Sequence, residues 1–320
     1  MPEQEVEIVE VGARDGLQNE PEVVPTATKI ALIERLVAAG ARRIEVASFV
    51  HPKRVPQMAD AEAVVAGLPV RPDVTYIGLV LNERGLERAL ATRDAAGHGI
   101  DEIGLVAVAA DGFGRANQGM DWQTSVESAC RIARRAAADG MRTQATVSVC
   151  WGDPFEGEVP LARVIEIVTR LAEAGLAEIA LADTIGVAVP VRVTALFERA
   201  REAVPNVRLR AHFHNTRNMA IANCWAAHET GVRVFDASLG GLGGCPFAPK
   251  ATGNVATEDV VYLFERSGIA TGLDLEALIA TNHWLTEKLG RPLPSMVGRA
   301  GGFPQARGDG SSQARGCARS

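Results

Sequence analysis

Short runs of β-branched and other apolar residues alternate along the chain with longer segments of helical character. Segment 5–12 (EVEIVEVG) is strand-like, whereas 26–40 (TATKIALIERLVAAG) has the apolar spacing of a helix, with a threonine near its start and a glycine at its end. The strand-like segments are 5–12, 42–49, 73–81, 101–110, 142–150, 178–184, 208–214 and 232–239. The helical segments that follow them are 26–40, 60–68, 83–92, 124–140, 161–175, 190–204, 218–231 and 257–268.

This alternation predicts the fold. Eight strand–helix units without a clear linker indicate a (β/α)8 barrel, the TIM-barrel fold, and a doubly wound parallel sheet is the competing architecture. Several strand segments are apolar almost throughout, as expected of parallel strands covered on both faces. Segment 274–290 predicts a further helix, so we expect one barrel domain, residues 1–295, that includes this C-terminal helix. The tail 303–320 is rich in Gly, Ser and Arg and is expected to be disordered.

The composition is that of a globular protein: 47% of the 320 residues are hydrophobic and 22% are charged. The net charge of −6, without a Lys/Arg cluster in the folded region, argues against nucleic acid and anionic membrane surfaces as partners. Because the acidic N-terminus leads directly into a strand and no apolar run reaches about 18 residues, neither a secretory signal nor a transmembrane helix is expected.

The five cysteines are odd in number and lack paired spacing, which favours a reduced, cytoplasmic setting. Cys130 and Cys224 lie in helical patterns and Cys150 ends a strand, so packing explains them. Cys245 differs, because four glycines stand within the six residues before it. Such a segment suits a loop that closes over a ligand, and the alternative is a flexible surface loop with an incidental cysteine.

Polar residues gather where the predicted strands end, which is where the active site of a barrel lies. Convergence of polar groups from many strands on one rim is hard to explain by stability alone. The residues are Arg14, Asp15 and Gln18 after the first strand, Glu45 and Ser48 in the second, Asp183 and Thr184 at the sixth, and His212 and His214 in the seventh.

His212 and His214 are two residues apart, so on a strand their imidazoles point to the same face. With Asp15 they would offer two nitrogens and an oxygen to a metal ion, and an amide such as that of Asn254 could add another oxygen. This mixture suits Mg²⁺ or Mn²⁺ better than a closed zinc site. The alternative is that hydrogen bonds satisfy both histidines without a metal. Similarly, Arg14 could form an ordinary ion pair with Asp15 or stabilise an oxyanion beside the metal.

Five motifs, in the expected order over roughly residues 5–295, resemble those of the 3-hydroxy-3-methylglutaryl-CoA lyases of the DRE-TIM metallolyase superfamily. They are VEVGARDGLQNE, IEVASFVHPKRVPQMAD, LADTIGV, HFHNT and GGLGGCPFAPKATGNVATEDVVY. The resemblance implies a TIM-barrel homodimer that uses Mg²⁺ or Mn²⁺ in a retro-Claisen reaction. An acyl-CoA thioester like 3-hydroxy-3-methylglutaryl-CoA would be cleaved into acetyl-CoA and acetoacetate.

The resemblance also implies roles for single residues at the matching positions. Arg14 would stabilise the enolate oxygen of the departing acetyl thioester, Cys245 would take part in proton transfer, and Glu45 would lie near the metal and orient its neighbours. The implied metal ligands are Asp15, His212, His214 and Asn254. The implied supporting and substrate-binding groups are Gln18, Ser48, Asn117, Asp183 and Thr184. A metal, an acid/base group and a cation are what this cleavage requires chemically.

Several nearby positions depart from the family pattern. Gln144 stands where an arginine is expected, which would remove a cation that could hold substrate or loop anions. The other departures are Ala110 for serine, Thr146 for tyrosine, Asp153 for cysteine, Ala182 for glycine, and NTRN at Asn215–Asn218 for DTYG. We therefore expect the reaction type to be kept while the acyl group stays open.

The first functional hypothesis is a hydroxymethylglutaryl-CoA lyase in the breakdown of leucine or related branched acids. The alternative keeps the chemistry but acts on citramalyl-CoA or a longer 3-substituted glutaryl-CoA. A condensing enzyme of the isopropylmalate synthase kind resembles the motif set less closely. A non-catalytic metal-binding paralogue is disfavoured because Arg14, Asp15 and Cys245 are all present.

Overall fold

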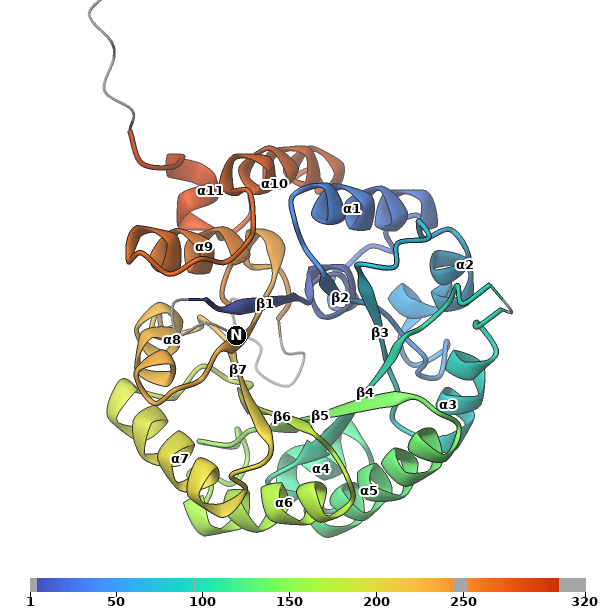
Figure 1. The fold of residues 1–320 in the computed structure, drawn as a ribbon, viewed down its shortest axis with the longest axis vertical. Coiled ribbons are helices and arrows are strands. Elements are labelled where there is room, and N and C mark those ends of the chain that lie inside the picture. Colours follow the sequence, from blue (N-terminus) through green and yellow to red (C-terminus); the bar gives the residue numbers. More distant parts are fainter. Residues whose placement is uncertain (1–4, 95, 245–252, 305–320) are drawn as a thin grey trace, which may run out of the picture.

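Eight parallel strands pair in sequence order, and pairing of the last with the first closes the sheet into a barrel (Figure 1). The structure is a computed structural model that describes residues 5–94, 96–244 and 253–304. The strands are β1 (Glu7–Glu10), β2 (Arg43–Ser48), β3 (Thr75–Leu79), β4 (Glu102–Val108), β5 (Arg142–Ser148), β6 (Glu178–Asp183), β7 (Arg208–Phe213) and β8 (Val234–Ala237). The predicted (β/α)8 barrel is confirmed. The doubly wound sheet is excluded because the strand order is closed.

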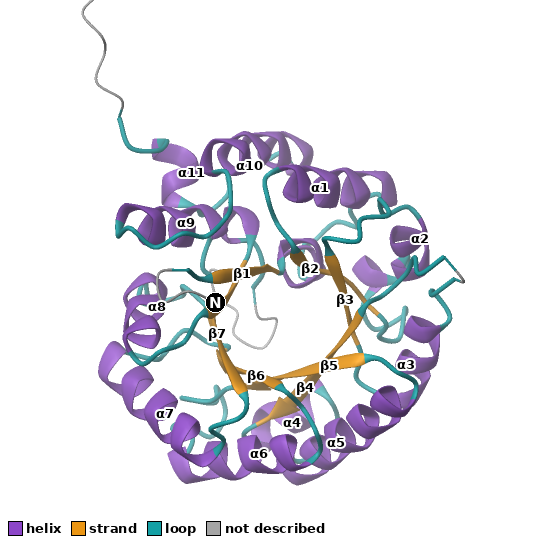
Figure 2. Ribbon diagram, in the orientation of Figure 1, coloured by secondary structure: helices purple, strands orange, loops and turns teal. Residues whose placement is uncertain are grey.

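Helices surround the barrel and cover its outer face (Figure 2). Those that follow the strands are α1 (Thr26–Ala38), α2 (Ala61–Ala66), α3 (Glu83–Leu90), α5 (Trp122–Ala138), α6 (Leu161–Glu173), α7 (Pro190–Ala203), α8 (Ala220–Glu229) and α9 (Thr257–Arg266). The predicted extra helix is α10 (Leu275–Leu289), which packs against α1 and α9. A short α11 (Met296–Ala300) follows and packs on α9 and α10.

The outer core forms because each strand is buried on both faces. Every residue of β2, β6 and β8 is buried, and helices present apolar stripes to the strands, as Val164, Ile167 and Leu171 do in α6. The inside of the barrel is different. There, buried ion pairs join strands that are not neighbours in the sheet, such as Arg43 in β2 with Glu178 in β6.

Some short elements are not predicted by the sequence pattern. A π-helical turn, η1 (Gly12–Gly16), follows β1, and α4 (Asp111–Asn117) stands between β4 and α5. Two 3-10 turns are η2 (Pro56–Met58) and η3 (Leu239–Gly241). Elements of this length are too short to show an apolar period. Of the expected tail 303–320, residues 305–320 lie outside the described residues.

A buried carboxyl group joins β1 to the segment that leaves β8. Glu10 accepts hydrogen bonds from the backbone N–H groups of Gly12 (2.7 Å) and Leu239 (2.9 Å) and from the hydroxyl of Thr257 (2.6 Å). A Cβ atom at Gly12 would lie only 2.6 Å from the Glu10 carboxyl, so this close approach requires glycine. Burial raises the pKa of Glu10 to about 7, even though the three hydrogen bonds act to lower it.

This pKa predicts a pH-dependent effect of Glu10→Gln. Because the folded-state pKa lies above the ordinary value of 4.5, the wild type loses stability as pH rises from 4.5 to about 7 and changes little beyond that, whereas glutamine does not titrate. Relative to wild type, the variant should gain about 3 kcal/mol of unfolding free energy between pH 5 and pH 8. Urea denaturation at both pH values measures this, with Glu22→Gln at an exposed position as the control. Parallel pH profiles for wild type and Glu10→Gln would contradict it.

Candidate active site

Three groups that can ligate a metal converge at the rim where β1 and β7 end. A carboxylate oxygen of Asp15 and one ring nitrogen each of His212 and His214 all lie within 4.8 Å of one another. The centroids of the two imidazole rings are 5.2 Å apart, and both histidines are buried. The structure therefore brings together the two nitrogens and the oxygen expected from the sequence.

Asp15 reaches this cluster because the chain turns sharply after β1. In η1 the backbone N–H of Gly16 donates to the carbonyl of Val11, a five-residue step that characterises a π-helical turn. Such turns are frequent at functional sites. The turn places Asp15 beside the two histidines and keeps Arg14 in contact with it.

The surroundings favour the forms of Asp15 and His214 that bind metals. Burial would raise the pKa of Asp15, but the charges of Arg14 and the two histidines lower it to about 2. Burial and the neighbouring His212 lower the pKa of His214 to about 4, so its ring is neutral at pH 7. The Nδ1 atom of His214 is buried without a hydrogen-bond partner among the described residues. An ionised carboxylate and a neutral imidazole with an orphaned nitrogen fit a divalent cation.

His212 is held by a carboxylate that the sequence analysis missed. Its Nδ1 lies 2.9 Å from Oδ2 of Asp236 in β8, which leaves Nε2 as the nitrogen free for a metal. Burial would lower the pKa of His212, but the Asp236 carboxylate outweighs it and raises this pKa. A carboxylate that orients a ligating histidine is a common arrangement in metal sites. The available signal was a lone aspartate within an otherwise apolar strand, VFDA.

Asn254 lies at the same cluster, together with the start of the glycine-rich segment. Its amide nitrogen donates to Oδ2 of Asp15 (2.7 Å) and to the carbonyl of Leu242 (3.0 Å). Gly243, with φ of +101°, passes so close that a Cβ atom there would lie 2.6 Å from this amide nitrogen. The backbone of Asn254 also bridges to that of His214. The chain thus enters segment 245–252 directly beside the cluster and returns to it.

Arg14 connects the cluster to Glu45 in β2. Its Nε and Nη2 atoms donate to Oε2 of Glu45 at 2.8 and 2.5 Å, and Nη1 donates to Asp15 at 2.7 Å. A guanidinium has five N–H groups, so two of them remain for another acceptor. Burial raises the pKa of Glu45, and the charge of Arg14 opposes this rise only in part. The pair therefore offers a fixed cation next to the potential ligands.

The supporting residues expected from the sequence fall into different surroundings. The hydroxyl of Ser48 and the side-chain oxygen of Gln18 are buried without a hydrogen-bond partner among the described residues. The β2–β3 register shifts between Glu45 and Ala47, and such a bulge re-aims the side chains beyond it, including Ser48. Asn117, by contrast, is exposed at the end of α4.

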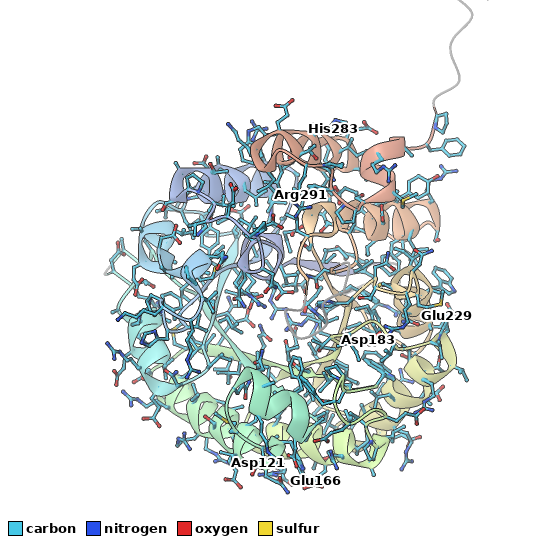
Figure 3. All side chains as sticks on the ribbon, turned by 180° about the vertical axis from the view of Figure 1, so that it is seen from behind. Asp121, Glu166, Asp183, Glu229, His283 and Arg291 are labelled. Carbon is cyan, nitrogen blue, oxygen red and sulfur yellow. The ribbon has the colours of Figure 1, made fainter. Side chains whose placement is uncertain are left out.

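Asp183 and Thr184 hold loops at the rim. The two carboxylate oxygens of Asp183 accept the backbone N–H groups of Val187 and Ala188, each at 2.9 Å, and the residue lies well inside the ring of outer helices (Figure 3). The hydroxyl of Thr184 accepts the backbone N–H of Val149 at 3.0 Å. Both residues therefore shape the loops after β5 and β6.

A family model described as HMGL-like matches residues 5–285. The chain belongs to the HMGL-like family. It is 45% identical over 311 residues to (R)-citramalyl-CoA lyase of Chloroflexus aurantiacus, and the matched region covers 94% of this chain and 96% of that protein. It is 42% identical over 290 residues to hydroxymethylglutaryl-CoA lyase of Bacillus subtilis, which covers 91% and 95% respectively.

Among solved structures, an HMG-CoA lyase from Acinetobacter baumannii in complex with coenzyme A and 3-methylmalate superimposes with a TM-score of 0.89. It shares 38% sequence identity, and the match covers 96% of this chain and 99% of that one. This HMGL-like protein is therefore an acyl-CoA lyase of the hydroxymethylglutaryl-CoA lyase kind. In the part that the structure describes, none of its helices combines the length and apolar character needed to cross a membrane.

Cys245 lies outside the described residues of this HMGL-like lyase. Cys130, Cys150 and Cys224 are buried and free, as expected from packing. Burial raises the pKa of the Cys150 and Cys224 thiols. These two thiols are therefore protonated and unreactive at neutral pH.

The departures from the family pattern are accommodated structurally. Asp153 is buried and accepts the backbone N–H groups of Phe113 (2.8 Å) and Phe155 (2.6 Å), so it links α4 to the loop after β5. In the NTRN segment, the side chain of Asn215 accepts the backbone N–H of Ala220 in α8. Asn218 has φ of +58°, a conformation that asparagine tolerates better than most residues.

The donor set predicts that His214→Ala abolishes tight binding of a divalent cation. The change removes one of the two ligating nitrogens in the cluster. Loss of a residue that only orients a ligand lowers metal affinity by about 10–100-fold, so loss of the ligand itself should weaken Mn²⁺ binding by at least about 100-fold. Calorimetric titration of chelator-treated protein measures the affinity. His51→Ala, at an exposed position, is the control. Equal affinity in wild type and His214→Ala would rule out this cluster as the metal site.

Proposed function

We propose that this chain is a divalent-metal-dependent carbon–carbon lyase that cleaves 3-hydroxy-3-methylglutaryl-CoA into acetyl-CoA and acetoacetate. The observation that carries the proposal is the cluster of Asp15, His212 and His214 next to the Arg14–Glu45 pair, in a chain of the HMGL-like family. Imidazole nitrogens mixed with carboxylate and amide oxygens favour Mg²⁺ or Mn²⁺ over a closed zinc site.

Asn254 would be the fourth ligand. Both of its side-chain hydrogen bonds use the amide nitrogen, so its carbonyl oxygen is the atom left to bind. The cleavage must remove the proton of the tertiary hydroxyl, break the adjacent carbon–carbon bond and leave the electron pair on the thioester as an enolate. When bound, the cation would polarise the hydroxyl oxygen and lower its pKa.

Arg14 would stabilise the enolate. Its two remaining N–H groups can donate to the thioester oxygen, on which negative charge develops as the bond breaks. Glu45 and Asp15 fix the guanidinium in advance, so little reorganisation is needed during the reaction. We propose that the role of Glu45 is to orient the Arg14 guanidinium.

Cys245 would move the proton. Overall, the hydroxyl loses one proton and the former methylene carbon gains one, so a single group that accepts and then donates a proton suffices. Gly243 and Asn254 flank the segment that carries Cys245, and both lie beside Asp15, which supports this assignment. The unpartnered polar groups of Gln18 and Ser48 are candidates for substrate hydrogen bonds, and Asn117 stays a weaker one because it is exposed.

A second candidate substrate is citramalyl-CoA, which would give acetyl-CoA and pyruvate. The 45% identity to an (R)-citramalyl-CoA lyase favours it. The two substrates differ by one methylene between the carbinol carbon and the terminal carboxylate, so the same residues can serve both reactions. Longer 3-substituted glutaryl-CoA thioesters are the remaining alternative. An acetoacetate-releasing enzyme would fit leucine breakdown.

The sparse cysteines are consistent with a cytoplasmic location, and we propose a homodimer as the assembly. Gel filtration with light scattering tests the assembly independently of activity.

The proposed roles predict a loss of turnover in Cys245→Ala. Loss of the proton-transfer group should lower kcat by about 10²–10⁴-fold while the affinity for Mn²⁺ stays unchanged. Release of acetyl-CoA from racemic hydroxymethylglutaryl-CoA measures the rate. Cys224→Ala, which removes a buried thiol in α8, is the matched control and should keep wild-type turnover. Turnover in Cys245→Ala that equals the control would remove Cys245 from the mechanism.

Product identity separates the two substrates. Incubation with hydroxymethylglutaryl-CoA should release acetoacetate, and its kcat/KM should exceed that for citramalyl-CoA, which releases pyruvate. A difference of one methylene predicts a ratio of about 10–200-fold. The reverse ratio would replace the proposed substrate by citramalyl-CoA. No turnover of any thioester in a protein that binds metal would support the non-catalytic alternative.

A further inference from the structure

A buried arginine lies directly beneath the metal cluster. Arg210 in β7 has the same strand parity as His212, and only 2% of its surface is exposed. Its Nη1 lies 3.3 Å from Oδ1 of Asp236, and its Nε lies 3.5 Å from Glu178. Its Nη2 donates to the side-chain oxygen of Gln144 in β5. Because β6 lies between β5 and β7 in the sheet, the last contact passes over β6 on the inner side of the barrel.

These contacts form a chain that ends at a potential ligand. The Arg210 guanidinium faces one carboxylate oxygen of Asp236, and the other oxygen contacts Nδ1 of His212 at 2.9 Å. Asp236 is 4% exposed and Arg210 is the arginine in ion-pair contact with it among the described residues, so loss of this guanidinium would leave the buried carboxylate poorly compensated. The carboxylate would then turn away, and His212 would lose the acceptor that fixes its ring.

We propose that Arg210 is a positioning residue of the metal centre: it holds Asp236 in place, and Asp236 in turn directs Nε2 of His212 toward Asp15 and His214. This inference rests on the metal site of the proposed function. The sequence resemblance places an arginine at position 144, where this chain has glutamine. In this chain β7 supplies an interior cation, Arg210, and Gln144 serves as its acceptor.

One consequence concerns the substrate. Gln144 is 3% exposed and bonded to Arg210, so it is not a free group at the rim. Thr146 also contacts this guanidinium, at 3.4 Å. The residues at positions 144 and 146 are therefore explained by their contacts with Arg210 inside the barrel, without reference to the acyl group.

The test measures metal affinity in the absence of substrate. Arg210→Met keeps much of the side-chain volume but removes the charge, and the chelator-treated variant should bind Mn²⁺ about 10–100-fold more weakly than wild type. Arg43→Met is the matched control. Arg43 belongs to the same buried ion-pair network and shares Glu178 with Arg210, but among the described residues it forms neither an ion pair nor a hydrogen bond with Asp236. Its charge acts on Asp236 only from a greater distance, so its loss should weaken Mn²⁺ binding by less than about threefold. Circular dichroism and thermal unfolding report the folding of both variants.

A second variant keeps the test decisive if Arg210→Met does not fold. In Gln144→Arg/Arg210→Ala, the longer side chain at 144 can place its guanidinium in the volume that Arg210 vacates. This variant should fold and bind Mn²⁺ within about threefold of wild type. A folded Arg210→Met with wild-type affinity would overturn the proposal, and so would a folded exchange variant with affinity more than about tenfold weaker. Wild type that binds no Mn²⁺ would instead refute the metal site of the proposed function.

Discussion

The site depends on one constraint: a carboxylate and two imidazoles are held within 4.8 Å of one another in surroundings largely closed to water. Charged and polar groups in such a place must be compensated, and the compensation explains most of the neighbouring residues. Arg14 and Asn254 satisfy Asp15. The Nδ1 atom of His214 has no hydrogen-bond partner among the described residues, which fits a group that a bound cation would help to satisfy.

The barrel makes this convergence possible, because the ends of distant strands meet at one rim. Strand–helix alternation was enough to predict the fold and the place of the site. The spacing of His212 and His214 was enough to predict their shared direction, and the convergence of their ring nitrogens with Asp15 confirms it. The π-helical turn that carries Asp15 could not be predicted, since five residues show no period and the turn depends on the close packing of Gly12 against Glu10.

Asp236 and Arg210 show a different limit of sequence reasoning. Both lie on strands, and the alternation of side chains along a strand is enough to predict that they face the barrel interior. Their partnership was not predictable, because it links β7 to β8 on one side and, past β6, to β5 on the other. Taken as a single position in the sequence, Gln144 in place of an arginine indicates the loss of a cation. In three dimensions this glutamine accepts a hydrogen bond from Arg210, so a buried cation is present near the metal ligands.

The central claim is that a cation at the Asp15–His212–His214 cluster supports the cleavage of an acyl-CoA thioester. The most direct test is the rate of thioester cleavage by chelator-treated protein as Mn²⁺ is added in steps. We expect no turnover without the cation and a rate that rises in proportion until about one ion is bound per chain. Undiminished turnover after removal of all divalent cations would contradict the claim.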